Sequence, residues 1–191
     1  SHLYSAYAIA EMLDCKEIDR ARGAYFLGAT APDVRVITRN DRAVTHFFDL
    51  AEYGVQDSVG RMFREYPDLE FGSDSEQDYV AFILGYITHL VLDELFISEV
   101  YRPIFAPVAE VIGGPRANLL DRVMQYEVDR VDRTNQSAME SVTRSLRTSF
   151  SLPNLPFIEQ ESLVEWLDVS IDISSQPPDY SRFAKMLGRH I

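Results

Sequence analysis

The sequence predicts an all-α protein built around one apolar helix. From Val80 to Leu92 nearly every position is apolar, so a helix there has no polar face and belongs in the middle of a packed domain. No alternating strand pattern of any length occurs, and no Asn-Gly or Asp-Gly hairpin signal is present. We expect this central helix to span about residues 75–101, to stop before Pro103, and to form the core of a multi-helix bundle.

Four further helices are expected before the central one. Apolar residues at helical spacing and flanking turn signals place them at about residues 3–13, 18–30, 41–48 and 52–66. Pro32 stops the second helix, and residues 34–40 are expected to form a loop or a short extended segment. Asp41 can cap the third helix. Asp74 or Ser75 can cap the central helix, with Asp78 in the capping-box position for Ser75.

The second half of the chain continues the helical pattern. A short helix over residues 104–112 is expected to end at Gly113. Longer helices follow at about residues 116–136, 137–150 and 159–173, and a last one follows Pro177 and Pro178. At 191 residues the chain is long enough to bury a core as one domain without disulfides. Residues 1–101 carry the candidate site, and residues 102–191 complete the core.

Charge and cysteine content limit the classes of function. The formal net charge of −12, with 30 acidic and 18 basic residues, opposes binding to nucleic acid. The single cysteine, Cys15, excludes an internal disulfide framework and a cysteine-based zinc site. Residues 1–13 lack a basic region and carry Glu11, so we expect no secretory signal there and a cytoplasmic location, although a processed secreted chain has the same appearance. The oligomeric state is open.

The apolar stretch also bears on membranes. Only the 14 residues from Tyr79 to Leu92 have this apolar character before Asp93, whereas a membrane-spanning helix needs about 20. We therefore expect no transmembrane segment.

Two polar side chains interrupt the central helix. His89 and Asp93 are spaced i and i+4, so they point from one face of the helix toward a common spot. Asp33 after Pro32 and His46 on the third helix complete a set of metal-ligand type. Two imidazoles and two carboxylates suit Zn²⁺, and also Fe²⁺ or Mn²⁺. The alternative is that His89 and Asp93 hydrogen-bond to each other in the core, with Asp33 as a cap and His46 as a surface ring.

These residues resemble a known family. The segments SHLYSAYAIA, YFLGATAPD, THF and LGYITHLVLDELF are similar to the zinc-dependent phospholipase C family, whose all-helical fold is shared with the P1-type nucleases. The resemblance covers about the first half of the chain. It implies that one metal ion is held by the following residues: Asp33, His46, His89 and Asp93. It also implies that His2 and Asp93 hold a second ion, that a bridging water is the nucleophile, and that Asp33 orients this water or accepts its proton. The alternative for His2 is no role in the site.

The chain also departs from the family pattern. The family's secreted phospholipases have another histidine shortly after the aspartate that corresponds to Asp93, but residues 94–97 contain none. They also use a later histidine and glutamate pair, whereas only His190 follows His89. Their amino-terminal tryptophan is absent, since the one tryptophan is Trp166. At least one metal site is therefore lost or rebuilt.

Other charged residues are candidates for a rebuilt site. Glu94, Glu127 and Asp129 could supply oxygen ligands, and the alternative for each is a solvated surface acid. Arg39 and Arg42 precede His46 and could contact a substrate phosphate, although such arginines are often ordinary loop residues.

The sequence thus leaves three functions to compare. The first is a metal-dependent phosphoric ester hydrolase with one or two ions, acting on a small soluble phosphoester. The second is a non-catalytic family member in which four ligands close around one structural ion. The third, a His-Asp phosphohydrolase, ranks last because the chain contains no His-Asp dipeptide.

Overall fold

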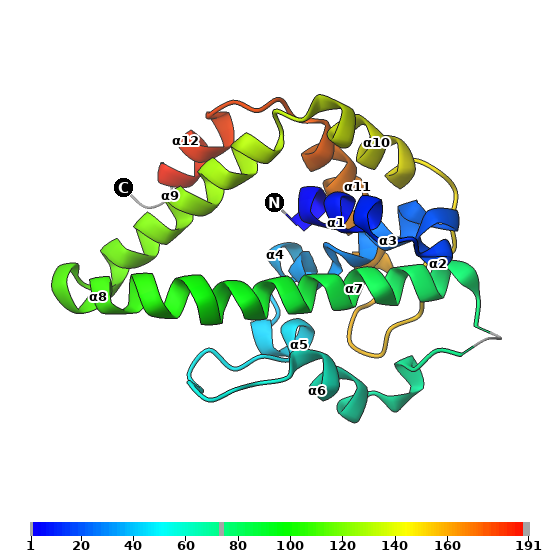
Figure 1. The fold of residues 1–191 in the computed structure, drawn as a ribbon, viewed down its shortest axis with the longest axis horizontal. Helices are drawn as coiled ribbons and strands as arrows, with labels where there is room; N and C mark the ends of the chain where they lie inside the picture. Colours follow the sequence, from blue (N-terminus) through cyan, green and yellow to red (C-terminus); the bar gives the residue numbers. More distant parts are fainter. Residues whose placement is uncertain (1, 73–74, 189–191) are drawn as a thin grey trace.

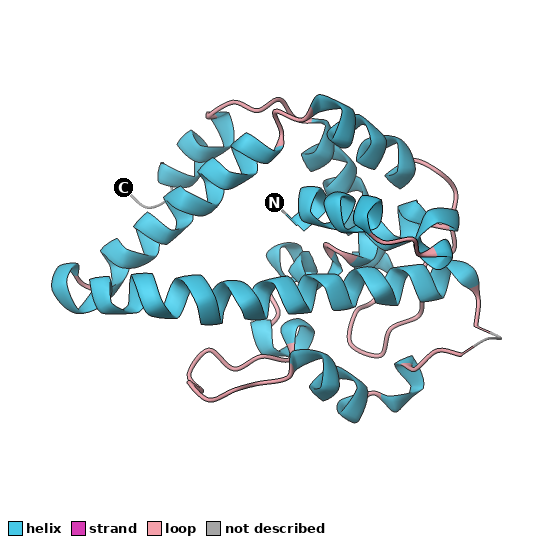
Figure 2. Cartoon of the chain, viewed as in Figure 1, coloured by secondary structure: helices cyan, strands magenta, loops and turns pink. Residues whose placement is uncertain are grey.

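Helices and loops make up the described part of the chain. The computed structural model describes residues 2–72 and 75–188, and within these ranges only an isolated bridge between Leu155 and Ile158 has strand-like pairing (Figure 2). The predicted all-α class is confirmed. The α-helices are α1 (His2–Met12), α2 (Lys16–Arg20), α3 (Arg22–Gly28), α4 (Arg35–Thr38), α5 (Arg42–His46), α6 (Ser58–Glu65), α7 (Gln77–Phe96), α8 (Ala106–Ile112), α9 (Gly114–Asp132), α10 (Gln136–Leu146), α11 (Gln160–Ser175) and α12 (Ser181–Leu187). The 3-10 helices are η1 (Ala31–Val34) and η2 (Pro67–Leu69), and η3 (Ile97–Phe105) is a π-helix.

The central helix is longer than the sequence predicts. Helices α7, η3 and α8 run end to end as one rod, and α9 returns from its far end (Figure 1). The expected stop before Pro103 is wrong, because Pro103 lies inside the π-helical segment. A proline removes one backbone donor and its ring collides with the carbonyl four residues earlier. The wider π turn changes this spacing, and the helix continues.

This rod, from Gln77 to Ile112, is long and apolar enough to cross a membrane by length and composition. The expectation that this helix is too short to span a membrane is therefore wrong about its length. Half of the most apolar window is buried inside the fold, and the core helix of a soluble protein passes the same test.

Helices α3 and α7 pack with their backbones in close approach. A Cβ atom at Gly28 would lie 2.0 Å from the carbonyl oxygen of Phe82, and one at Gly85 would lie 2.0 Å from the carbonyl oxygen of Tyr25. Only glycine fits at these two contacts. Large side chains around them, such as Phe26 and Phe82, are fully buried, and each contributes about 2 kcal/mol by leaving water.

Three predicted segments before the rod are wrong in detail. The helix expected over 18–30 is divided into α2 and α3 at Ala21, whose backbone is non-helical. Residues 34–40 are largely helical, because η1 leads directly into α4. The helix expected over 52–66 begins only at Ser58, where Asp57 caps it by accepting from the Gly60 amide.

The start of α7 also differs from the predicted capping box. Glu76 is the cap residue and makes no side-chain cap hydrogen bond, while Asp74 lies outside the described residues. The Asp78 carboxylate instead accepts from the Ser151 amide at 2.7 Å. A distant loop thus uses the carboxylate that local sequence assigned to the helix.

The second half of the chain supports the segment that carries Asp33. The indole Nε1–H of Trp166 on α11 donates to the carbonyl oxygen of Thr30 at 2.8 Å, and the hydroxyls of Ser170 and Thr30 lie 3.2 Å apart. These contacts hold the chain just before η1. His190 lies outside the described residues.

Candidate metal centre

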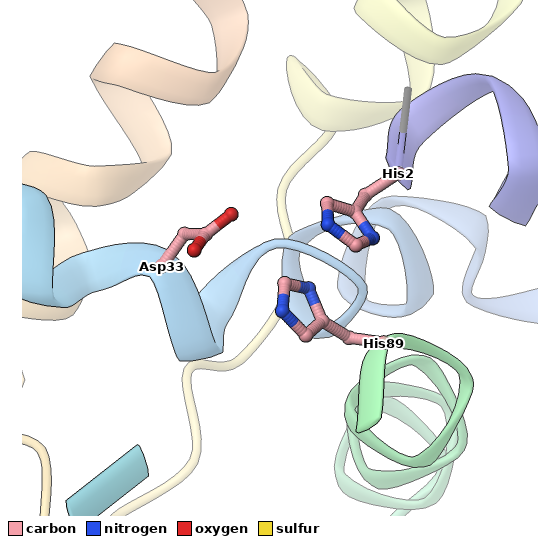
Figure 3. Close-up of side chains that lie close together, drawn as sticks. All are labelled: His2, Asp33 and His89. Atoms are coloured by element: carbon pink, nitrogen blue, oxygen red, sulfur yellow. The ribbon is translucent and has the colours of Figure 1, made fainter. Parts of the chain in front are cut away.

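Five residues predicted as metal ligands converge at one place. They are His2 at the start of α1, Asp33 in η1, His46 at the end of α5, and His89 and Asp93 on α7. Two overlapping groups have ligand atoms within 4.8 Å of one another: His2, Asp33 and His89, and His46, His89 and Asp93. Figure 3 shows His2 and Asp33 pointing toward His89 from separate elements.

The close packing of α3 and α7 orients His89. Its ring is fully buried, and its Nδ1 lies 2.9 Å from the carbonyl oxygen of Ala29, directly after α3. A carbonyl oxygen only accepts, so Nδ1 carries the proton and donates it. In the neutral ring the lone pair is therefore on Nε2, which faces the cluster.

A chain of two hydrogen bonds orients His46 in the same way. The hydroxyl of Thr45 donates to the carbonyl oxygen of Pro32 at 2.9 Å, and this uses its only hydrogen. The Thr45 oxygen, 3.0 Å from Nδ1 of His46, must then accept from that nitrogen. His46 is 3% exposed, and it also presents the Nε2 lone pair to the cluster. The expectation of His46 as a surface ring is wrong.

The two lone pairs face each other, which fits a cation. Nε2 of His46 and Nε2 of His89 are 3.4 Å apart, and with both protons on Nδ1 neither can donate to the other. Two imidazole ligands of a tetrahedral zinc ion, with zinc to nitrogen distances of about 2.0 to 2.1 Å, have nitrogens about 3.3 to 3.4 Å apart. The residues present therefore fit a divalent metal ion.

Asp93 connects the ring nitrogens on both sides. Its Oδ2 lies 3.5 Å from Nε2 of His46 and 3.9 Å from Nε2 of His89, while its Oδ1 lies 3.4 Å from Nε2 of His2. The 3.9 Å separation is too long for a hydrogen bond, so the alternative of a simple His89 and Asp93 pair in the core is wrong. Oδ2 also accepts from Nη2 of Arg42.

The charge state of the cluster follows from burial and from its neighbours. Burial lowers the pKa of His2 to about 3. Burial also lowers the pKa of His46, although the neighbouring Asp33 opposes that shift. Burial by itself would raise the pKa of Asp33, but the neighbouring imidazoles outweigh it and the pKa is lowered. Burial would also raise the pKa of Asp93, but His89, His2 and Arg42 outweigh it and the pKa is lowered. Neutral imidazoles and ionised carboxylates are the forms that bind metal.

The backbone behind His46 is strained and held in place. Phe47 ends α5 with φ 53°, in the left-handed region that a bulky side chain rarely adopts. Its ring is 1% exposed and packs edge-on against Tyr66 and Phe157, which offsets this strain. The buried Tyr86 hydroxyl donates to the Thr45 carbonyl oxygen at 2.6 Å, so this core residue also fixes the turn that carries His46.

Other predicted site residues lie elsewhere. Glu94 accepts from the amide and the hydroxyl of Ser58, at 3.0 and 2.6 Å, and Glu127 is exposed and paired with Arg130. Neither belongs to the groups of ligand atoms found among the described residues. Asp129 pairs with Arg133 at 2.8 Å.

Of the two predicted phosphate-binding arginines, only Arg42 is seen in contact with the cluster. Arg39 is exposed and ends α4 with φ 61°.

Sequence reasoning missed the groups that orient the ligands. Thr45 directly precedes His46, and a hydroxyl residue beside a candidate ligand is a weak signal that could have been noted. The Ala29 and Pro32 carbonyls have no such signal, because every residue carries one.

Comparison of the chain with family models, with curated proteins and with solved structures found no match. Functional assignment therefore starts from the geometry of this cluster.

Proposed function

We propose that the protein is a metal-dependent phosphoric ester hydrolase similar to the zinc-dependent phospholipases C. The observation that supports this most directly is the pair of opposed Nε2 lone pairs on His46 and His89, with two ionised carboxylates beside them. Without a cation between them, two buried acceptor lone pairs 3.4 Å apart repel each other and lack a donor, which makes this arrangement unfavourable in a metal-free centre. Zinc is the expected ion, and iron or manganese is compatible with the same donors.

The exposure of the cluster supports catalysis over a purely structural ion. The side chain of Asp33 is 37% exposed and that of His2 is 29% exposed, whereas His46 and His89 are buried behind them. One side of the cluster is thus open to water. A structural site instead closes four protein ligands around its ion.

The residues divide the chemical work as follows. When bound, the divalent ion lowers the pKa of a coordinated water and polarises a phosphoryl oxygen. Asp33, ionised and on the open side, accepts a hydrogen bond from the attacking water and orients it. Nδ1 of His46 donates to the Thr45 hydroxyl and Nδ1 of His89 donates to the Ala29 carbonyl oxygen. These two hydrogen bonds hold both rings with Nε2 free to bind the ion. A small soluble phosphoester is the expected substrate.

Metal content and activity test this proposal together. Wild-type protein, His89→Ala and Asp33→Asn are dialysed against chelator, reloaded with Zn²⁺ and analysed by elemental mass spectrometry, then assayed with bis(p-nitrophenyl) phosphate and a short-chain phosphatidylcholine. We expect bound zinc in the wild type and its loss in His89→Ala.

We also expect hydrolysis that falls more than the zinc content does in Asp33→Asn. Zinc without hydrolysis of any phosphoester in a broad panel would favour the structural ion. Absence of metal from every preparation would refute both functions.

A further inference from the structure

Arg42 contacts the oxygen of Asp93 that faces the histidine pair. Its Nη2 donates to Oδ2, and the same Oδ2 lies 3.5 Å from Nε2 of His46 and 3.9 Å from Nε2 of His89. His46, His89 and Asp93 form one of the two groups of ligand atoms. The guanidinium therefore binds the oxygen atom that Asp93 presents to the two ring lone pairs.

Little else holds this arginine. The side chains of Arg42 and Asp93 are only 20% and 23% exposed, so their contact is shielded from bulk water. The bond from Nη2 is the one side-chain hydrogen bond that Arg42 makes within the described part of the chain, and its Nη1 is buried there without a partner. A buried donor without a partner is unfavourable. The guanidinium thus owes its position to Asp93, and the loss of a single hydrogen bond releases it.

An ion at this oxygen and the Arg42 guanidinium disfavour each other. A zinc to oxygen distance is about 2.0 to 2.2 Å and a charge-assisted hydrogen bond is about 2.7 to 2.9 Å long, so the two cations would lie at most about 5 Å apart. Screening is weak in a partly buried site, and the two cations would repel strongly at this separation. An ion must therefore overcome this repulsion or break the bond to Arg42, and either requirement lowers its affinity.

Asp93 reaches the histidines without help from Arg42. It lies on α7, one turn after His89, and α7 is fixed against α3 by the close contacts at Gly28 and Gly85. The core thus sets the position of the Asp93 backbone. Removal of the arginine leaves the ligand oxygen within reach of an ion.

We propose that Arg42 is the counter-ion of the metal-free centre: it holds Oδ2 of Asp93 until a divalent ion displaces it, and it thereby weakens metal binding. The inference rests on the proposed function, because it assumes that the cluster binds a metal ion. Arg42 is then a positioning residue. The consequence is an ion that exchanges with solvent more readily than it would with the same ligands and no arginine.

Zinc affinity tests this competition, because removal of a competitor and removal of a support have opposite effects. Metal-free wild type, Arg42→Gln and Arg42→Lys are titrated with Zn²⁺ by calorimetry against a competing chelator. Arg42→Gln keeps a polar side chain but removes the charge, and it should bind zinc at least about tenfold more tightly than wild type. Arg42→Lys keeps the charge and should stay within about threefold of wild type.

The stability of the metal-free protein should change in the opposite direction. Without Arg42 the Asp93 carboxylate loses its cationic partner, so the urea midpoint of metal-free Arg42→Gln should lie below that of metal-free wild type. A residue that only supported the structure would lower both stability and zinc affinity when replaced. As a control, Arg64→Gln removes an arginine whose side chain is 68% exposed on α6, and it should change neither quantity measurably.

A labelling experiment on wild type needs no variant, and it keeps the test valid if circular dichroism shows that Arg42→Gln does not fold. p-Hydroxyphenylglyoxal reacts with accessible guanidinium groups, and peptide mass spectrometry gives the labelling rate of Arg42 with and without Zn²⁺. Displacement from Asp93 should raise this rate, whereas the labelling rate of Arg64 should stay the same.

Two results would overturn the inference: a zinc affinity of folded Arg42→Gln that is equal to or below that of wild type, or an Arg42 labelling rate that zinc does not raise. Absence of zinc binding by wild type would instead refute the proposed function, so the two failures are distinguishable.

Discussion

The Thr45 hydroxyl links His46 to the Pro32 carbonyl oxygen, and Thr45→Val tests its role. Valine keeps the shape of the fully buried threonine but removes its hydroxyl. Two hydrogen bonds are lost, one from His46 Nδ1 at 3.0 Å and one to the Pro32 carbonyl at 2.9 Å. Each loss leaves a buried polar group unpaired at a cost of about 1 to 3 kcal/mol, so the free energy of unfolding should fall by about 2 to 6 kcal/mol.

Metal affinity should fall as well. Without an acceptor at Nδ1, the His46 ring is no longer held with its lone pair on Nε2, and loss of such a partner typically weakens metal binding about 10- to 100-fold. Urea unfolding followed by the fluorescence of Trp166, the only tryptophan, measures stability. Calorimetric Zn²⁺ titration against a competing chelator measures affinity.

A matched control separates the two effects. The Thr143 hydroxyl also has two hydrogen-bond partners: it donates to the Met139 carbonyl oxygen and accepts from the Ser174 hydroxyl, both at 2.8 Å, but it lies on α10 outside the cluster. Thr143→Val should lower stability and leave zinc affinity unchanged, and Thr45→Ser should restore most of the affinity. If Thr45→Val binds zinc as tightly as wild type, Thr45 does not orient His46 and the tautomer argument is refuted.

Further predictions concern packing, pH and the support of η1. Gly85→Ala should lower the free energy of unfolding by at least about 1 to 3 kcal/mol and weaken zinc binding in the calorimetric titration. Its Cβ would lie 2.0 Å from the Tyr25 carbonyl oxygen and push α7 away from α3. As a control, Gly72→Ala should change neither quantity, because no atom lies within 4 Å of its added Cβ. In metal-free protein the folded pKa of His2 is about 3 against 6.5 unfolded, so the unfolded state binds more protons below pH 6.5. Stability present above pH 6.5 should therefore be lost as pH falls toward 3, and thermal melts from pH 7 to 4 should show a shallower loss in His2→Gln; equal slopes would contradict this. Trp166→Phe removes the hydrogen bond to the Thr30 carbonyl oxygen and should lower the free energy of unfolding by about 1 kcal/mol in melts followed by circular dichroism. An unchanged melting temperature would show that this bond does not stabilise the segment before η1.

Helix class and the ligand types follow from local patterns. The apolar run of α7 is readable because a fully buried helix needs no polar face, and His89 and Asp93 share a face at any i, i+4 spacing. The helix boundaries are less readable. Pro103 lies inside the rod and the segment before Ser58 is not helical, because packing and π-helical spacing outweigh local stop and start signals.

Local sequence patterns do not separate true site residues from neighbours of the same chemical type. Glu94 has the right chemistry for a ligand and lies next to Asp93 in the sequence, yet its carboxylate binds Ser58 at the start of α6. One residue of displacement on a helix turns a side chain by about 100°, so neighbours in sequence need not share a site.

By itself, the sequence determined the all-α class, the buried central helix and the identity of five metal-type side chains. Only the tertiary structure decided that these side chains meet, which nitrogen of each histidine is free, and that Arg42 contacts Asp93. The physical reason is that helical periodicity acts over one or two turns, whereas the centre depends on the close approach of α3 and α7 at Gly28 and Gly85. That approach places the Ala29 carbonyl against His89, and a carbonyl group leaves no pattern in the sequence.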